Sequence, residues 1–448
     1  MVKDLTEGSP ARLILMFTLP LLAGNIFQQL YAFVDTLIVG RFLGVNALAA
    51  VGCTGCLMFL MMGFVMGTSA GLSIVTGQRF GARDEEGVRR SAATCGIVAI
   101  ALSILLTIFG ILTAKPLLVL METPPEILEG ATSFISIIYG GVALIMLFAT
   151  QTNLIRSLGD SRTPTIMLAC GLGLNIIFEP IYIIGFGWGI PGAALATVSS
   201  QVFANLICFF YIVKKVPALR TRRSDWRVSR EEIWRHLRVG LPMGFQGSVI
   251  AIGAIILQVA LNNLGPISVA AYAAAQKIDT IAVMPMMSFG MAMAAYTAQN
   301  YGAQKLSRIK EGVKKCIMMS GAFSIAVGAF NILLGSRMIE LFVGAEETQV
   351  IEYGTAYLVI NGACYIILSL LFILRYTLQG LGQTVVPTIA GMMELLMRAI
   401  AALVLCKYFG YIGACWANPL AWVGSLAPLL MAYVVTRRTL VDRAQSAR

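Results

Sequence analysis

The sequence is poor in charged residues: Asp, Glu, Lys and Arg make up only 12% of its 448 residues, and it contains a single histidine. Soluble domains carry about 25% charged residues, so a chain with this composition cannot cover itself with polar surface in water. Hydrophobic residues reach 58%. These values exclude a soluble protein and indicate a polytopic membrane protein from which no soluble domain of useful size can be separated.

Motifs for catalysis and metal binding are also missing. The sequence has no GxxxxGK[ST] phosphate loop, no serine with a histidine partner, and no carboxylate cluster of the kind that binds Mg²⁺-pyrophosphate. The nine cysteines are scattered, and the CxxC of Cys53 and Cys56 lacks a second pair, so we interpret them as small apolar residues. We therefore predict that the protein is not an enzyme and uses no cofactor. We also expect no removable signal peptide, and we expect His236 to be solvated in a basic loop.

Long apolar segments, in contrast, are abundant. They predict an all-α membrane protein with twelve transmembrane helices, each long enough to cross about 30 Å of hydrocarbon. The predicted spans are residues 13–38, 46–76, 92–113, 131–155, 164–185, 190–213, 239–262, 267–298, 316–335, 353–378, 386–406 and 411–435.

The basic residues fall mainly on one side of this topology. Of 33 lysines and arginines, 26 lie in the termini and in loops on the same side, four lie in the opposite loops, and three lie within spans. This asymmetry predicts that both termini and the basic loop 214–238 are cytoplasmic, in a multi-pass protein of the prokaryotic cytoplasmic membrane. It also accounts for the net charge of +11 without a nucleic-acid partner. Residues 229–238 are expected to form a short surface helix, whose charges either contact anionic lipid or are simply solvated.

The two halves of the chain resemble each other at an offset of about 222 residues. QRFGA at 78–82 matches QNYGA at 299–303, and SLGDSRTPTI matches GLGQTVVPTI. Each half holds six spans, an even number, so the copies are related by a pseudo-two-fold axis along the membrane normal. We therefore expect a six-helix N-lobe (1–213), a cytoplasmic linker (214–238), a six-helix C-lobe (239–435) and a cytoplasmic tail (436–448).

The first span carries a polar stripe inside an apolar helix. Gln28, Tyr31 and Asp35 are three and four residues apart, which places them on one helix face. A carboxylate in hydrocarbon is costly unless it is protonated, paired or bound to a cation. Asp35 is therefore a candidate ion site, although an interfacial carboxylate solvated by water is the simpler alternative.

Other spans of the first half carry matching polar groups. Asn175 and Glu179 share one face of the fifth span, and Pro180 interrupts the helix ladder directly after them. Polar residues also occur in the fourth and sixth spans: Tyr139, Asn153, Thr197 and Gln201. Acids, amides and hydroxyls supply oxygen ligands, which suit Na⁺ or a proton shared between carboxylates.

The repeat provides an internal control for the two acids. At an offset of about 222 residues, the counterparts of Asp35 and Glu179 are Leu257 and Ala401, or apolar neighbours of these two. The same scaffold is therefore built without acids in the second half. Because a requirement of the fold would appear in both halves, we predict that Asp35 and Glu179 serve function.

The second half contains its own charges within spans. Glu394 and Arg398 are four residues apart and are expected to form an ion pair. Lys277 and Asp279 are two residues apart and should point to different faces, whereas Arg375 should snorkel to a nearby cytoplasmic end. Structural pairing and a role on the substrate path are both open for these residues.

Four motifs together resemble the multidrug and toxic compound extrusion (MATE) transporters. They are PxxxxxxxQxxxxxxDTxxVGxxxGxxALAA, GQRFGARD, RSLGDSRTP and LNIIxEP with GxxGAALAT, and the resemblance covers essentially the whole chain. It implies two six-helix lobes and drug efflux driven by an inward Na⁺ or H⁺ gradient. The N-lobe cation site of that family carries over to Asp35, Asn175, Glu179 and Thr197, with Gln28, Tyr139 and Asn153 around it.

This sequence also departs from that family's usual pattern. It has Glu179 where the family usually has aspartate, and the acids that the NorM-like branch carries in its seventh and tenth helices are absent. The chain therefore resembles the DinF-like branch more closely than the NorM-like branch.

We expect an antiporter that exports amphiphilic, often cationic, compounds in exchange for H⁺ or Na⁺. The alternative is a flippase for a lipid-linked or polyisoprenoid substrate, which should line its cavity with several basic residues. We expect a monomer whose partners are small-molecule substrates and membrane lipid. The predicted cation-coupling residues, with Na⁺ as one candidate ion, are Asp35, Asn175, Glu179 and Thr197, and the predicted substrate or cavity residues are Gln28, Tyr31, Tyr139, Asn153, Gln201, Lys277 and Asp279.

Overall fold

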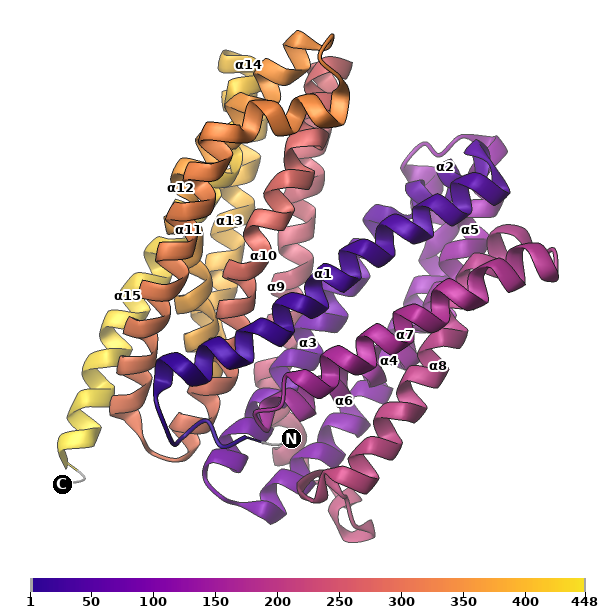
Figure 1. Cartoon of the computed structure of the whole chain (residues 1–448). Helices are drawn as coiled ribbons and strands as arrows, with labels where there is room; N and C mark the ends of the chain where they lie inside the picture. Colours follow the sequence, from indigo (N-terminus) through magenta and orange to yellow (C-terminus); the bar gives the residue numbers. More distant parts are fainter. Residues whose placement is uncertain (1–2, 447–448) are drawn as a thin grey trace. The chain divides into compact units, whose positions relative to one another are not determined.

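The computed structural model describes the backbone of residues 3–446 and the side chains of residues 3–438, and every regular element in these residues is a helix (Figure 1). This confirms the all-α class. The helices are α1 (Pro10–Leu43), α2 (Val45–Cys53), α3 (Gly55–Gly81), α4 (Glu85–Leu120), α5 (Pro125–Gly140), α6 (Val142–Ser157), α7 (Arg162–Pro180), η1 (Ile181–Gly185), α8 (Gly189–Lys215), η2 (Pro217–Leu219), η3 (Arg223–Trp226), α9 (Arg230–Asn263), α10 (Pro266–Gly302), α11 (Leu306–Val343), α12 (Thr348–Gly380), α13 (Val385–Ile400), η4 (Ala401–Leu405), α14 (Cys406–Cys415) and α15 (Ala417–Ser446).

The number of spans agrees with the prediction. Within the described residues, eleven helical segments are each long and apolar enough to cross a membrane, and the pair α5 and α6, bent by 46°, brings the number to twelve if it is counted as one broken span. The bend lies at Gly141, where a Cβ atom would collide with the side chain of Val198 on α8. A glycine at the break and the close approach of α8 together account for the kink.

Two π-helical turns occupy corresponding places in the two repeats. η1 follows Pro180 at the end of α7, and η4 follows Ile400 at the end of α13. Pro180 therefore does not end the helix, as a helix-breaking residue would, but leads directly into a wider turn. Because η4 forms without a proline, the wider turn belongs to the repeated scaffold rather than to Pro180 alone.

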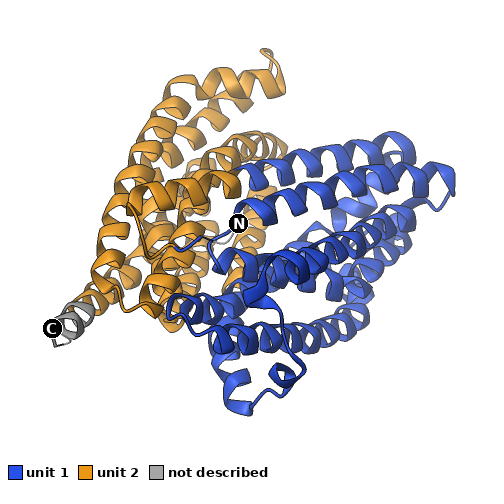
Figure 2. Cartoon of the chain, turned by 60° about the horizontal axis from the view of Figure 1, so that its bottom comes forward, with its two compact units in different colours: residues 1–4, 23–244 blue, residues 5–22, 245–448 orange. Residues whose placement is uncertain are grey.

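The chain forms two compact units, which are coloured separately in Figure 2. Unit 1 comprises residues 1–4 and 23–244, and unit 2 comprises residues 5–22 and 245–448. The chain passes between the units at three points: two of them fall inside a helix, one in α1 and the other in α9, and the third lies between residues 4 and 5. In unit 2 the N-terminal segment is held by hydrogen bonds: the Leu5 N–H donates to Gln299 Oε1 (2.9 Å), and Asn300 Nδ2 donates to the Leu5 carbonyl (3.1 Å).

The segment that links α8 to α9 differs from the expected surface helix. Residues 217–226 contain only two short 3₁₀ turns, η2 and η3, and the helix expected at 229–238 is the beginning of α9. This helix starts at Arg230 and continues without interruption to Asn263. Residues 230–239 contain no proline or glycine, and α9 continues through Gly240 and Pro242, so one helix serves both.

His236 contradicts the prediction that it would be solvated, because its side chain is fully buried. Its Nε2 lies 2.7 Å from Ser91 Oγ on α4, and its Nδ1 lies 2.9 Å from the Glu232 carbonyl. Glu232 in turn forms a bidentate ion pair with Arg79 of α3, with N–O distances of 2.6 and 2.7 Å. These contacts attach the first turns of α9 to α3 and α4 within unit 1.

A close contact between α11 and α12 in unit 2 depends on glycine. A Cβ atom at Gly328 would lie 2.5 Å from the Gly362 carbonyl oxygen, whereas a Cβ atom at Gly321, two turns earlier on the same helix, would meet nothing within 4 Å. We expect Gly328→Ala to destabilise the protein by about 1–3 kcal/mol, because the two backbones must separate. Gly321→Ala is the matched control and should be neutral or slightly stabilising, because alanine favours helix more than glycine does.

Thermal unfolding of the two variants in the same detergent tests this prediction. Equal midpoints for Gly328→Ala and Gly321→Ala would show that the α11–α12 contact tolerates a side chain.

Candidate functional site

The first component of the candidate site is a polar face of α1 in unit 1. Tyr31 and Asp35 are one turn apart, and the Tyr31 hydroxyl donates to Asp35 Oδ1 at 3.4 Å. Both side chains are half-buried, whereas Gln28, one turn earlier, is exposed. The predicted polar stripe is therefore present, and its burial increases toward the acid.

The second component is the buried end of α7. Glu179 is fully buried, and Asn175 is 2% exposed one turn before it. Asn175 Nδ2 donates to Thr197 Oγ1 on α8 at 3.1 Å and lies 3.5 Å from Ser200 Oγ. Residues of α8 thus accept hydrogen bonds from the amide nitrogen of Asn175, and they leave its amide oxygen without a hydrogen bond.

The two components meet within unit 1. The carboxyl groups of Asp35 and Glu179 are close enough to interact electrostatically, and Tyr31 is within the same range of both Glu179 and Thr197. Both carboxylate oxygens of Glu179 and the Asn175 Oδ1 are buried without a hydrogen-bond donor among the described residues. Buried oxygens without donors are rare in proteins. A proton on the carboxyl pair, or a hard cation bound by these oxygens, would satisfy them.

The corresponding positions of unit 2 show what this scaffold does without acids. Leu257 and Ala401 stand in place of Asp35 and Glu179, and both are buried in one apolar cluster. The two counterpart positions therefore lie in the same apolar cluster of unit 2. Unit 2 has apolar side chains at these two positions, whereas unit 1 has carboxyl groups. The fold therefore does not require the acids.

The remaining predicted residues of unit 1 have other surroundings. Tyr139 is buried in an apolar core and packs against Gly110 of α4, while Asn153 accepts a hydrogen bond from Arg156 at 3.4 Å. Gln201 lies one turn after Thr197 on α8, and its Oε1 is buried without a donor among the described residues. Gln201 thus extends the line of unsatisfied oxygens, whereas Tyr139 and Asn153 are engaged in packing and in a contact with an arginine.

Asp279 is the centre of a separate polar cluster in unit 2. It is 7% exposed and accepts hydrogen bonds from Tyr365 (2.6 Å) and Tyr357 (3.2 Å) of α12. Asn331 donates to the Tyr365 hydroxyl and Asn418 donates to the Tyr357 hydroxyl. The sequence analysis did not identify the two tyrosines or the two asparagines of this cluster. The spacing of eight residues between Tyr357 and Tyr365, which puts both tyrosines on one face of α12, was the available signal.

Lys277 is exposed on the opposite side of α10 from Asp279, as the spacing of two residues predicts.

Three charged residues of unit 2 form a buried triad. Glu394 pairs with Arg398 at 3.0 Å, which confirms the predicted ion pair, and it also pairs with Arg375 at 2.8 Å. The prediction that Arg375 snorkels is wrong, because this side chain is 5% exposed and also donates to Ser425 at 2.8 Å. The second partner of Glu394 comes from another helix, and spacing along one helix cannot reveal it.

Comparison with known families supports one assignment. The MatE family profile matches residues 20–181 and 242–404, and the two matched segments start 222 residues apart, which confirms the internal repeat. A probable multidrug resistance protein of Bacillus subtilis (strain 168), YoeA, is 28% identical over 391 residues, which cover 86% of this chain and 84% of YoeA. The multidrug export protein MepA of Staphylococcus aureus (strain NCTC 8325 / PS 47) is 22% identical over 443 residues, covering 98% and 97%.

Solved structures show the same fold. The outward-facing conformation of a multidrug resistance MATE family transporter of the MOP superfamily superposes with a TM-score of 0.89 at 24% identity, covering 98% of each chain. A MATE protein crystallised in complex with MaL6 superposes with a TM-score of 0.90 at 23% identity, covering 98% of this chain and 99% of the other.

Proposed function

Because this chain belongs to the MatE family of membrane transporters, we propose that it exports amphiphilic, often cationic, compounds in exchange for H⁺ or Na⁺ by alternating access. It is a transporter and not an enzyme. The relatives named as multidrug resistance or export proteins support the substrate class. Residues 239–262 and 353–378 contain no acid, which accords with the proposed DinF-like branch rather than the NorM-like branch.

The observation that carries the coupling proposal is the pair of carboxyl groups in unit 1. Asp35 and Glu179 interact, and the oxygens of Glu179 and Asn175 lack donors among the described residues. Two adjacent, poorly solvated carboxyl groups cannot easily both stay ionised without a cation. A coupling proton or Na⁺ would therefore bind the conformation in which the pair is assembled, and its differential affinity would bias the transporter toward one access state.

Proteoliposomes with separately imposed Na⁺ and H⁺ gradients test this proposal, with ethidium as the transported probe. We expect ethidium movement to depend on at least one of the two inward cation gradients and to stop when an ionophore dissipates it. Ethidium movement that is equally fast with neither gradient would contradict cation-coupled export.

The alternative of a flippase for a lipid-linked substrate loses support in unit 2. Of the three basic residues within its predicted spans, Arg375 and Arg398 are buried and both are bound to Glu394. Only Lys277 is exposed. A pyrophosphate group would therefore have to break a buried ion pair to reach the arginines, which is costly.

The proposed orientation places both termini and residues 214–238 in the cytoplasm of a prokaryotic cell. Ser224 lies in this segment and is exposed, and Glu126 is exposed at the start of α5, on the opposite side in the proposed topology. We expect a cysteine at Ser224, in a cysteine-free background, to react with a membrane-impermeant maleimide only after permeabilisation, whereas a cysteine at Glu126 should react in intact cells. The reverse pattern would invert the topology.

A further inference from the structure

The linker between α8 and α9 has a charge distribution that its sequence does not show. Residues 214–238 contain nine lysines and arginines and three acids, Asp225, Glu231 and Glu232. Along the chain, these signs are interspersed. In the structure, they are sorted between an inner face against α3 and α4 and an outer face.

Two of the three acids point inward. Asp225 is 4% exposed, accepts a hydrogen bond from the Arg222 backbone N–H at 2.7 Å and lies 3.6 Å from Arg89 of α4. Glu232 is engaged with Arg79 of α3. Only Glu231 remains outside, where it pairs loosely with the exposed Arg235 at 3.5 Å. The acids therefore attach the linker to unit 1 and leave the outer face with a large excess of positive charge.

The basic residues of the linker, in contrast, are all exposed: Lys214, Lys215, Arg220, Arg222, Arg223, Arg227, Arg230, Arg235 and Arg238. Two tryptophans lie among them. Trp234 is 63% exposed, and Trp226 is 48% exposed, with one edge of its ring beside Gly96 of α4. Exposed tryptophan is costly in water but is favoured at the head-group level of a bilayer, where its ring is partly dehydrated.

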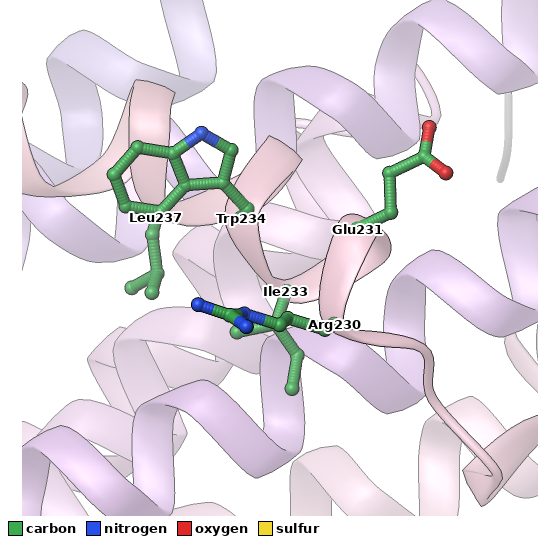
Figure 3. Close-up of a pocket in the computed structure, with 5 residues that line it drawn as sticks. All are labelled: Arg230, Glu231, Ile233, Trp234 and Leu237. Atoms are coloured by element: carbon green, nitrogen blue, oxygen red, sulfur yellow. The ribbon is translucent and has the colours of Figure 1, made fainter.

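A groove of about 590 Å³ adjoins this outer face at the start of α9. Five residues line it: Arg230, Glu231, Ile233, Trp234 and Leu237. All except Glu231 follow Arg230 at helical spacings of three, four and seven residues, so these four form one stripe. Figure 3 shows the Arg230 guanidinium, the Trp234 ring and Leu237 on the same side of the helix, with the Glu231 carboxylate pointing away. The groove thus combines a cation with an apolar floor.

We propose that the outer face formed by Arg223, Trp226, Arg227, Arg230 and Trp234, here named the basic platform, binds anionic phospholipid. The arginines contact head-group phosphates, and the groove receives the glycerol and the first acyl carbons beside Trp234. Charge complementarity selects this occupant, because the platform carries several uncompensated guanidinium groups next to exposed indoles. Its position also selects lipid, because the platform joins the ends of two membrane-spanning helices, α8 and α9, and therefore lies near the head-group layer.

Quenching of tryptophan fluorescence in nanodiscs tests the proposal. The full chain is placed in phosphatidylcholine discs that contain an equal mole fraction of either brominated phosphatidylglycerol or brominated phosphatidylcholine. We expect stronger quenching by the anionic lipid, because the attraction of a single basic residue corresponds to about fivefold local enrichment. Trp234→Phe should reduce this difference, because it removes the more exposed of the two platform tryptophans. Trp226 should report the part that remains.

The charge dependence is tested with matched variants. Replacing Arg223, Arg227 and Arg230 with glutamine should abolish the preference for the anionic lipid. Replacing Lys310, Lys314 and Lys315, three exposed lysines of α11 in unit 2, should leave it unchanged. Equal quenching by both lipids in the parent protein, or equal losses in the two triple variants, would overturn the proposal. So would displacement by inorganic phosphate beyond the effect of NaCl at the same ionic strength, because the platform would then bind free anions. None of these measurements depends on transport activity.

Discussion

Replacing Asp35 with asparagine is expected to abolish gradient-driven efflux while leaving the protein folded. The substitution nearly preserves the side-chain shape but removes the charge that interacts with Glu179. The remaining carboxyl group of Glu179 can then be protonated without a charged neighbour. The site therefore no longer couples transport to the binding and release of a cation. Ethidium efflux should fall to the rate measured without a gradient, a loss of about 5–150-fold if the coupling free energy is in the typical range of about 1–3 kcal/mol.

Thr36→Val is the matched control for this prediction. Thr36 is the next residue of α1, is exposed, and donates only to the Ala32 carbonyl of its own helix. This variant should pump like the parent, and both variants should elute from size exclusion as the parent does. A well-folded Asp35→Asn protein that pumps at close to the parent rate would show that the coupling group lies elsewhere, with Asp279 the first residue to test.

Variants of Glu179 extend the same argument. Glu179→Gln should resemble Asp35→Asn or be milder, because it removes the second charge of the pair. Glu179→Asp retains the charge but withdraws it from Asp35, so it should stay active with a changed preference between Na⁺ and H⁺. If protons and Na⁺ share this site, lowering the pH should raise the Na⁺ concentration needed for half-maximal efflux.

Replacing Glu394 with glutamine is expected to destabilise unit 2 by about 3–5 kcal/mol, because it leaves two buried guanidinium groups without a counter-charge. Arg375 and Arg398 are both paired with Glu394, and all three side chains are less than a tenth exposed. The melting temperature in detergent should fall well below that of the parent. The folded fraction should keep gradient-driven efflux, because the role of Glu394 is to neutralise the arginines.

Arg398→Met provides the comparison for this effect. It leaves the Arg375–Glu394 pair, which is neutral and in which Arg375 also donates to Ser425, so it should destabilise much less than Glu394→Gln. Equal melting temperatures for Glu394→Gln and the parent would refute the triad as a structural element. Loss of coupling in a fully stable Glu394→Gln protein would instead identify Glu394 as a transport residue.

Much of the fold follows from local sequence patterns. Hydropathy over some 20 residues responds to the membrane whatever the neighbouring helices are, so the twelve spans could be predicted. Helical periodicity likewise predicts that Tyr31 and Asp35 share one helix face, and a hydrogen bond between them confirms this. It also predicts that Lys277 and Asp279 lie on different faces of one helix, and the first is exposed while the second is buried. The repeat identified Leu257 and Ala401 as counterparts of the acids, and both lie in one apolar cluster of unit 2.

What only the tertiary structure decided is which faces of distant helices meet. Arg79 and Glu232 are 153 residues apart, and Ser91 and His236 are 145 residues apart, yet these contacts bury the histidine and turn the acids of the linker inward. Arg375 likewise finds Glu394 on another helix. Composition and periodicity give a charged residue its helix face but not its partner, and the partner determines whether burial is tolerated. For this reason the sequence alone determined the class, the spans and the acid stripe, while the structure decided which charges are neutralised and which remain to face lipid.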